Sequence, residues 1–145
     1  YAQGQYESVK AYVHGIAPEK PIHIGETGWS SISVGFYGNN GSFAADEYKQ
    51  AIYHNAMREW TDAEGISCFY FEAFDEQWKD PNHSEGSENH FGLITLDGQA
   101  KYGLWDLVDE GVFEGLSRGG QEITKTFEGD TTALLQTVSA PKRRR

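Results

Sequence analysis

The fold is decided by two short apolar stretches, Pro21-Ile22-His23-Ile24-Gly25-Glu26 and Ile66-Ser67-Cys68-Phe69-Tyr70-Phe71-Glu72-Ala73-Phe74. The first stretch ends abruptly in a carboxylate. The second is too short and too aromatic to favour a helix. We therefore interpret both as buried strands, in which nearly every side chain meets another layer of the protein.

Helical patterns lie before and between these stretches. Residues 5–15 carry apolar side chains at three- and four-residue spacing until Gly15, which predicts one helix. Residues 43–63 form the strongest pattern, with Ser42 as the expected N-cap and Gly65 just beyond the end. The apolar side chains of this second helix recur at every fourth position: Tyr48, Ile52, Ala56 and Trp60.

The second half of the chain is less regular. An acidic, polar loop covers residues 75–90, and a third helix is predicted over residues 100–110. The apolar side chains of this helix should face inward: Leu104, Leu107 and Val108. Residues 117–145 contain Gly119-Gly120 and end in four basic residues, so we expect an extended or loosely ordered tail there.

Helices that alternate with strands indicate a parallel α/β architecture, in which each helix covers a face of the sheet. Such a sheet must be covered on both sides, and two or three strands are too few to form it. We therefore expect this chain to be the C-terminal part of a larger protein.

The composition argues against several classes of function. The 22 acidic and 12 basic side chains give a formal charge of −10, which is unfavourable for a nucleic-acid partner. No run approaches the ~20 apolar residues that span a bilayer, and no signal peptide is visible. Cys68 is the single cysteine, so no disulfide can form within the chain.

Carboxylates gather where the two predicted strands end. In parallel α/β folds, side chains at the carboxyl ends of the strands point into the functional site. Alternation along the first strand puts Glu26 on the face shared by Ile22 and Ile24, and turns His23 toward a covering helix. The end of the second strand and the residues after it carry three more acids: Glu72, Asp75 and Glu76.

Aromatic residues accompany these acids in the sequence. Trp29 follows Glu26 by three positions, and Trp78 follows Glu76 by two. Sugars suit such a combination, because their C–H faces stack on rings while their hydroxyl groups need carboxylate acceptors. The pattern therefore favours a carbohydrate as the bound molecule.

Three segments together resemble glycoside hydrolase family 17, the family of β-1,3-glucanases and related glucanosyltransferases. They are Gly25-Glu26-Thr27-Gly28-Trp29-Ser30, Phe71-Glu72-Ala73-Phe74-Asp75-Glu76-Gln77-Trp78-Lys79 and His90-Phe91-Gly92-Leu93. The resemblance covers residues 1–116 and implies about strands seven and eight, with their helices, of a (β/α)₈ barrel. Ser30 and Gln77 stand where the family often has proline, and neither position performs chemistry.

The same resemblance implies a role for individual residues. Glu26 would be the nucleophile, and Glu76 and Lys79 would support it from the loop after strand eight. Substrate-binding side chains are expected at five positions: Trp29, Phe36, Tyr37, Glu72 and Trp78. The implied activity is hydrolysis of β-1,3-glucan without a metal or other cofactor, at an extracellular, periplasmic or cell-wall location.

The resemblance also implies an acid/base glutamate that is not found in this sequence. A retaining glycosidase holds two carboxyl groups ~5–5.5 Å apart, one as nucleophile and one as acid/base. The family's acid/base glutamate ends strand four, usually after Gly-Asn, and nothing before Glu26 resembles it. A whole barrel takes ~250 residues, so we expect this chain alone to be inactive. Lys79 would keep Glu26 or Glu76 ionised by lying within ~4–6 Å of it.

Other interpretations of the same residues are open. Glucanosyl transfer shares the covalent intermediate and differs only in what attacks it. A non-catalytic glucan-binding remnant would keep the aromatic groove without the acid. An unrelated α/β structural domain would make the agreement of separate motifs a coincidence. A metal site is also conceivable, but its candidates lack an established ligand spacing: Asp80, His83, Glu85, Glu88 and His90.

Overall fold

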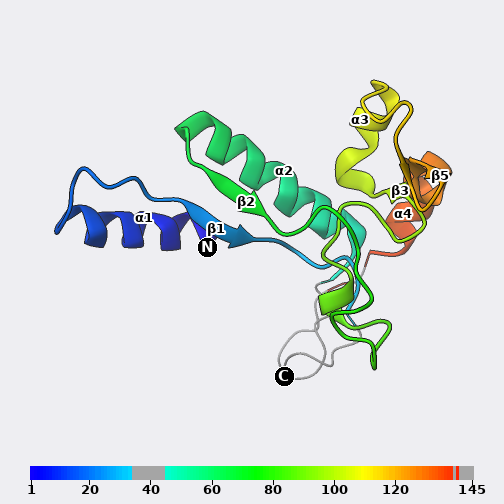
Figure 1. The fold of residues 1–145 in the computed structure, drawn as a ribbon, viewed down its shortest axis with the longest axis horizontal. Coiled ribbons are helices and arrows are strands. Elements are labelled where there is room, and N and C mark those ends of the chain that lie inside the picture. The colour runs from blue at the N-terminus through cyan, green and yellow to red at the C-terminus, as the bar shows by residue number, and fades with distance from the viewer. Residues whose placement is uncertain (34–44, 139, 141–145) are drawn as a thin grey trace.

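The computed structural model describes residues 1–33, 45–138 and 140. The proposed N-cap Ser42, the expected substrate-binding residues Phe36 and Tyr37, and the four basic residues at the end of the chain lie outside these residues. In Figure 1 the described part is elongated, with the helix–strand units at one end and short elements at the other.

Two strands lie side by side in the first half, as the sequence predicts. Strand β1 (Ile24–Thr27) pairs in parallel with β2 (Cys68–Tyr70), with Ile24 opposite Cys68 and Thr27 opposite Tyr70. Helix α2 (Glu47–Glu64) lies along β2 and connects the two strands (Figure 1). The predicted helix-between-parallel-strands arrangement is therefore confirmed.

The prediction that these strands are buried is wrong for the described chain. Phe69 in β2 is 66% exposed, and Gly25 and Glu26 in β1 are exposed. His23 is also exposed, and not packed under a helix. The apolar side chains that led to the prediction are present, but the described chain does not cover them.

Helix α1 (Ala2–His14) begins a few residues earlier than the sequence predicts and ends before Gly15. None of its residues is buried. Its main contact is Tyr6, whose ring meets that of Trp60 edge to face at a centroid distance of 5.4 Å. Val9 and Tyr12 lie on the predicted apolar face and are exposed. The helix is therefore correctly predicted, while its apolar face is uncovered.

Helix α2 (Glu47–Glu64) begins later than predicted. Its N-cap is Asp46, whose side chain accepts a hydrogen bond from the Lys49 backbone amide. Gly65 ends the helix in the left-handed conformation, with φ 64°, as expected of a glycine at this position. The buried face differs from the apolar stripe in the sequence, and consists of Glu47, Gln50, Ala51, Met57 and Thr61.

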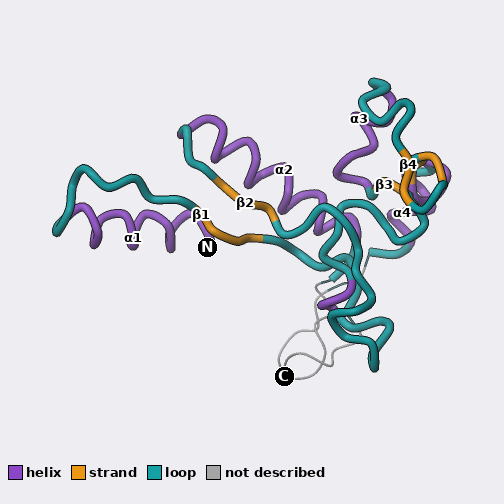
Figure 2. The backbone as a smooth tube through the Cα atoms, in the orientation of Figure 1, coloured by secondary structure: helices purple, strands orange, loops and turns teal. Residues whose placement is uncertain are grey.

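The segments that follow β1 and β2 are loops, drawn in teal in Figure 2. They are joined directly, because the Ser31 amide donates to the carbonyl of His90 over 2.9 Å. A short 3₁₀ turn, η1 (Ser87–Asn89), lies within the longer loop.

The predicted third helix is shorter than expected. It consists of the 3₁₀ turn η2 (Tyr102–Leu104) and helix α3 (Trp105–Asp109), preceded by the short strand β3 (Gln99–Ala100). Leu104 and Val108 turn inward as predicted, but Leu107 is exposed. The core here is formed by Ile94, Ala100 and Leu104, with partly buried neighbours Leu93, Val108, Phe113 and Ile123.

The expectation of an extended or loosely ordered tail is wrong for residues 117–138. Strands β4 (Ser117–Arg118) and β5 (Gln121–Glu122) form an antiparallel hairpin, and β6 (Thr124–Lys125) pairs in parallel with β3. The 3₁₀ turn η3 (Thr126–Gly129) and helix α4 (Thr131–Gln136) follow. Leu134 is fully buried and α4 contacts α2, so this segment packs on the rest of the chain. Its elements are too short to produce a periodic pattern in the sequence.

Candidate active site

The carboxyl ends of β1 and β2 meet at one edge of the strand pair. The Phe71 amide, just after β2, donates to the Thr27 carbonyl at the end of β1 over 2.7 Å. Glu26 lies next to Thr27 and is exposed, so a molecule arriving at this edge can reach it. Glu72 comes directly after Phe71. The parallel pairing thus places Glu26 and Glu72, two of the three expected site carboxylates, on adjacent strand ends.

Gly28 allows the two strand ends to approach each other closely. A Cβ atom at this position would lie 1.8 Å from the carbonyl oxygen of Phe71, which no side chain can tolerate. Gly92 has the same function on the other side of the loop, since its Cβ would lie 2.0 Å from the Asp75 amide nitrogen. These glycines of the sequence motifs are explained by backbone contact between the loops.

Lys79 joins two of the expected site acids. Its Nζ lies 2.5 Å from Glu72 Oε2 and 3.2 Å from Glu76 Oε2. The ammonium also lies over the Phe71 ring, 3.9 Å from the centroid. The loop therefore turns back so that a cation sits between two carboxylates and against an aromatic face.

The charged side chains of this cluster shift one another's pKa values. The hydrogen bond from Lys79 lowers the pKa of Glu76 below its ordinary value. Burial raises the pKa of Glu72, and its contact with Lys79 only partly opposes that effect. Burial acts to lower the pKa of Lys79, but hydrogen bonds to Glu72 and Glu76 outweigh it, so the Lys79 pKa is raised. Lys79 and Glu76 therefore favour their ionised forms in each other's presence.

The two carboxylate oxygens of Glu72 differ in their surroundings. Its Oε2 contacts Lys79, whereas the buried Oε1 has no hydrogen-bond partner among the described residues. A buried carboxylate oxygen without a donor is unfavourable. This oxygen can accept a further hydrogen bond only if neighbouring side chains move to expose it.

The two expected tryptophans lie in different surroundings. Trp29 is partly buried, with its ring centroid 5.4 Å from that of Tyr53 on α2. It lines a cavity of 260 Å³ together with Phe91, Ser30 and Ser87. Trp78 is 71% exposed. Both rings are accessible, and Phe36 and Tyr37 lie outside the described residues.

Gln50 connects α2 to both loops of the site, and the sequence analysis did not identify it. Its Nε2 lies 2.9 Å from the Trp29 carbonyl oxygen and 3.1 Å from the carbonyl oxygens of Phe91 and Gly92. A glutamine within an amphipathic helix is ordinarily assigned to the surface, so no signal in the sequence distinguishes it.

A buried charge network lies behind the acid cluster, and the sequence analysis also missed its connections. Lys101 Nζ donates to Asp75 Oδ1 over 2.8 Å and to Ser31 Oγ over 2.7 Å. His90 Nδ1 lies 3.6 Å from Asp75 Oδ2. Asp75 is recognisable in the sequence only as one of several strand-end acids, and its partners are distant in the chain.

Two of the residues considered for a metal site, Asp80 and His83, are paired with each other. His83 Nδ1 pairs with Asp80 Oδ1 at 2.7 Å, and the Asn89 amide group donates to the Asp80 carbonyl over 2.8 Å. Within residues 1–33 and 45–138, no group of three or more His, Cys, Asp or Glu side chains is arranged to hold a metal ion. No helix in the described part of the chain is long and apolar enough to cross a membrane.

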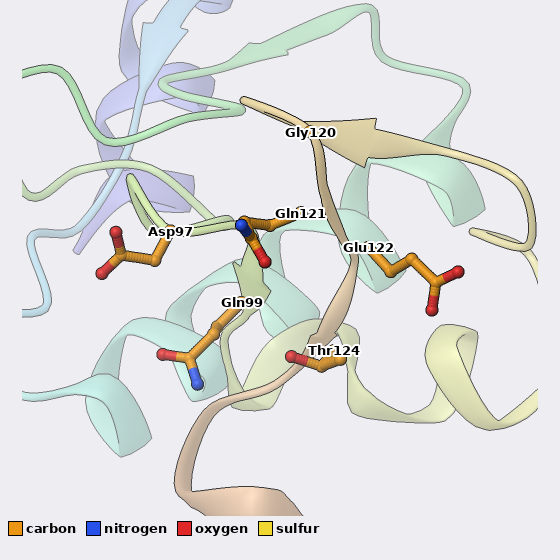
Figure 3. A pocket seen from close by; sticks show the side chains of 6 residues that line it. All are labelled: Asp97, Gln99, Gly120, Gln121, Glu122 and Thr124. Atoms are coloured by element: carbon orange, nitrogen blue, oxygen red, sulfur yellow. The ribbon is translucent and has the colours of Figure 1, made fainter.

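A second cavity lies away from these residues. Figure 3 shows its lining side chains, which belong to β3, β5, β6 and adjoining turns: Asp97, Gln99, Gly120, Gln121, Glu122 and Thr124. Its volume is 790 Å³, and it contains neither an aromatic residue nor any of the expected site residues. We therefore place the candidate site at the ends of β1 and β2.

The described architecture is that of an α/β protein with carboxylates at the ends of parallel strands. The family model for glycosyl hydrolases family 17 matches residues 13–105. This match covers more than half of the chain, so the chain belongs to that family, and the resemblance noted in its motifs is confirmed.

Curated relatives agree with this assignment. A glucan 1,3-beta-glucosidase of Arthroderma benhamiae is 38% identical over 88 residues, which are 56% of this chain and 27% of that protein. The enzyme of the same name from Saccharomyces cerevisiae is 39% identical over 85 residues, 56% of this chain and 25% of that protein.

One solved structure extends the match to the whole chain. An endo-laminarinase from Formosa Hel1_33_131 has a TM-score of 0.91 and 60% identity, and the match covers 100% of this chain and 37% of that one. A Rhizomucor miehei beta-1,3-glucanosyltransferase mutant with laminaritriose has a TM-score of 0.52 and 28% identity, covering 69% and 34%. The chain thus shares the fold of part of these enzymes and spans well under half of their length.

Proposed function

We propose that the full-length protein containing this chain hydrolyses β-1,3-glucan and that Glu26 is its nucleophile. The observation that carries the proposal is the placement of Lys79 between Glu72 and Glu76, on the strand end adjacent to that of Glu26. The names of the relatives, an endo-laminarinase and glucan 1,3-beta-glucosidases, support the same substrate class.

We also propose that β1 and β2 are about strands seven and eight of a (β/α)₈ barrel, built mainly by residues 1–116. An incomplete barrel accounts for the uncovered apolar side chains of α1 and β2, such as Val9, Tyr12 and Phe69. It also accounts for the position of the acids, since barrel enzymes carry their site at the carboxyl ends of the strands.

The reaction follows the retaining route. The Glu26 carboxylate attacks the anomeric carbon, the bond to the leaving oxygen breaks, and an acid supplied from outside this chain protonates that oxygen. The same group then removes a proton from water, which releases the sugar from Glu26. Glu76 and Lys79 hold a fixed pattern of charge on the loop after β2, the strand that pairs with the strand of Glu26. In the full-length protein this preorganisation would stabilise charge that develops in the transition state.

Substrate binding is assigned to the aromatic and acidic residues around this edge. The Glu72 carboxylate, whose side chain is partly exposed, accepts a sugar hydroxyl, and Trp29 and Trp78 stack against sugar faces. Phe36 and Tyr37 complete the proposed subsite walls. From the family resemblance we also propose an extracellular, periplasmic or cell-wall location.

The test is incubation of the full-length protein with laminarin, followed by reducing-end measurement and proton NMR of the first products. We expect new reducing ends that appear first as the β-anomer, because two successive displacements retain configuration. Initial formation of the α-anomer would exclude Glu26 as a covalent nucleophile. Binding of laminarin without any new reducing ends would indicate a glucan-binding protein instead.

Glucanosyl transfer is the second candidate, and the structural similarity to the Rhizomucor miehei glucanosyltransferase favours it. Transfer uses the same glycosyl-enzyme but ends with attack by a sugar hydroxyl. Chromatography of products from a short laminari-oligosaccharide separates the two outcomes. Products longer than the substrate indicate transfer, and shorter products alone indicate hydrolysis.

A further inference from the structure

Asp75 is held by groups from several distant segments. Its side chain accepts from Lys101, its carbonyl accepts from Arg118 Nη2 over 2.6 Å, and its amide donates to the Ile94 carbonyl over 2.9 Å. His90 faces the other carboxylate oxygen. The residue is 4% exposed. Asp75 therefore has little freedom to move, and it immediately precedes Glu76.

Arg118, in strand β4 of the C-terminal hairpin, donates hydrogen bonds to backbone carbonyls near this loop. Its Nη1 donates to the carbonyls of Ile94 and Thr95 over 3.1 and 2.9 Å. Its guanidinium carbon lies 4.8 Å from the centroid of the Phe74 ring. The backbone on both sides of the acid-bearing loop is thus tied to β4.

Lys101 connects this loop to the other half of the site. It is 3% exposed and donates to Ser31 Oγ as well as to Asp75. Ser31 lies two residues after Trp29, on the loop that leaves β1. A single buried ammonium therefore fixes the loop from β1 against the loop from β2.

We propose that Asp75 is a positioning residue that, through Lys101 and Arg118, sets the Glu76–Lys79 pair relative to the loop carrying Trp29. This inference rests on the proposed glucan chemistry for its effect on rate. It assigns no contact with substrate to Asp75 and no proton transfer.

The charged groups around Asp75 determine the effect of removing its negative charge. The cationic or titratable groups near Asp75 are Lys101, His90 and Arg118. Two other acids, Glu47 and Glu72, also raise the pKa of Lys101. Burial lowers the pKa of Lys101, and Asp75 opposes that effect. An Asp75→Asn variant keeps the shape but leaves a buried ammonium without its closest counterion. The loop should then shift, and Glu76 should lose its contact with Lys79.

The kinetic test compares Asp75→Asn with Asp109→Asn in the full-length protein. Asp109 lies at the end of α3, where its side chain is 64% exposed and paired with Lys125. We expect Asp75→Asn to lower kcat on laminarin about 10- to 100-fold with little change in KM, because displaced site groups stabilise the transition state less well. The acidic limb of its pH–rate profile should move to higher pH. Asp109→Asn should match the parent.

A second pair of variants separates positioning from simple loss of packing. The double variant Asp75→Asn/Lys101→Met removes both buried charges and should recover part of the lost kcat. Arg118→Lys retains a cation but cannot reach all three carbonyls, so it should give a smaller loss with the same direction of pH shift. If Asp75→Asn fails to fold, Arg118→Lys carries the test. A parent-like rate and pH profile in the folded variants would overturn the proposal.

The last measurement does not require activity. Carbon-13 NMR of the Glu76 carboxyl group should show a higher pKa in Asp75→Asn than in the parent. A higher pKa in a protein that never cleaves laminarin would leave the positioning role standing and reject the proposed function. An unchanged pKa and kcat in an active enzyme would reject the positioning role alone.

Discussion

Lys79 is the residue on which the charge state at the end of β2 depends. It contacts Glu72 and Glu76 and lowers the pKa of Glu76. Its own pKa is raised by these two acids in spite of burial. A change at this one position should therefore alter pH dependence as well as rate.

Lys79→Met removes the cation while keeping much of the side-chain length. The pKa of Glu76 should rise toward its ordinary value, and the acidic limb of the pH–rate profile on laminarin should move to higher pH. Turnover should fall most at low pH and recover partly as pH rises. Lys20→Met, in an exposed connector, is the control. A uniform loss at every pH would instead indicate direct contact between Lys79 and the sugar.

Glu26→Gln should remove nearly all turnover in the full-length protein, because the amide cannot form the glycosyl ester. The circular dichroism spectrum and the melting temperature should stay close to those of the parent, since Glu26 is exposed. Glu19→Gln, also exposed, should retain full activity. Near-parental turnover in Glu26→Gln would end the assignment of the nucleophile.

His90 should contribute pH-dependent stability. Burial acts to lower the pKa of His90, but the contact with Asp75 outweighs it, and the folded-state pKa is raised. The contribution is therefore complete below the unfolded pKa of ~6.5 and is lost as pH rises through the folded value. Urea unfolding of the parent and of His90→Gln should differ more at about pH 6 than at about pH 8.5. An equal difference at both values would contradict this reading of His90.

At the scale of elements, α2 matters for the site through its buried polar face. Gln50 is 1% exposed and hydrogen-bonds to backbone carbonyls of both site loops. The helix therefore holds the loops through amide contacts in addition to apolar packing. The apolar residue Ile52 on the same helix is exposed in the described chain.

Gln50→Ala should lower the free energy of unfolding by about 1–3 kcal/mol, because buried carbonyls lose their donor. Equilibrium denaturation by urea measures the change. Gln136→Ala, at the exposed end of α4, should change stability by less than about 0.5 kcal/mol. Equal effects of the two substitutions would show that the Gln50 contacts contribute little.

At the scale of the whole molecule, the described chain leaves much apolar surface exposed. Val9, Tyr12, Ile16 and Phe69 belong to the half that carries α1, β1 and β2. The matched endo-laminarinase is longer, with 37% of its chain covered. We infer that the remaining part of the protein covers this surface and supplies the acid.

The isolated 145-residue chain should therefore release no reducing sugar from laminarin above a vector control. It should also bind a hydrophobic dye such as ANS and be poorly soluble, because uncovered apolar faces and an open sheet edge favour association. Measurable hydrolysis by this chain alone would show that the acid lies within it.

The local elements and the family could be predicted from the sequence. The spacing of apolar residues located α1 and α2, the apolar runs located β1 and β2, and the motifs around Glu26 and Glu76 indicated family 17. Gly65 marked the end of α2 correctly. These features depend on neighbouring residues, so periodicity and short motifs reveal them.

Contacts between groups that are distant in the sequence could be seen only in the folded chain. Ser31, Asp75, Lys101 and Arg118 converge from four separate segments, and each is an ordinary polar residue in its own sequence context. Residues 117–138 looked loosely ordered for the same reason, since their short strands are stabilised by partners elsewhere in the chain. Burial of β1 and β2 was overestimated because an apolar run shows that a strand can be covered, whereas coverage depends on layers that other segments must provide.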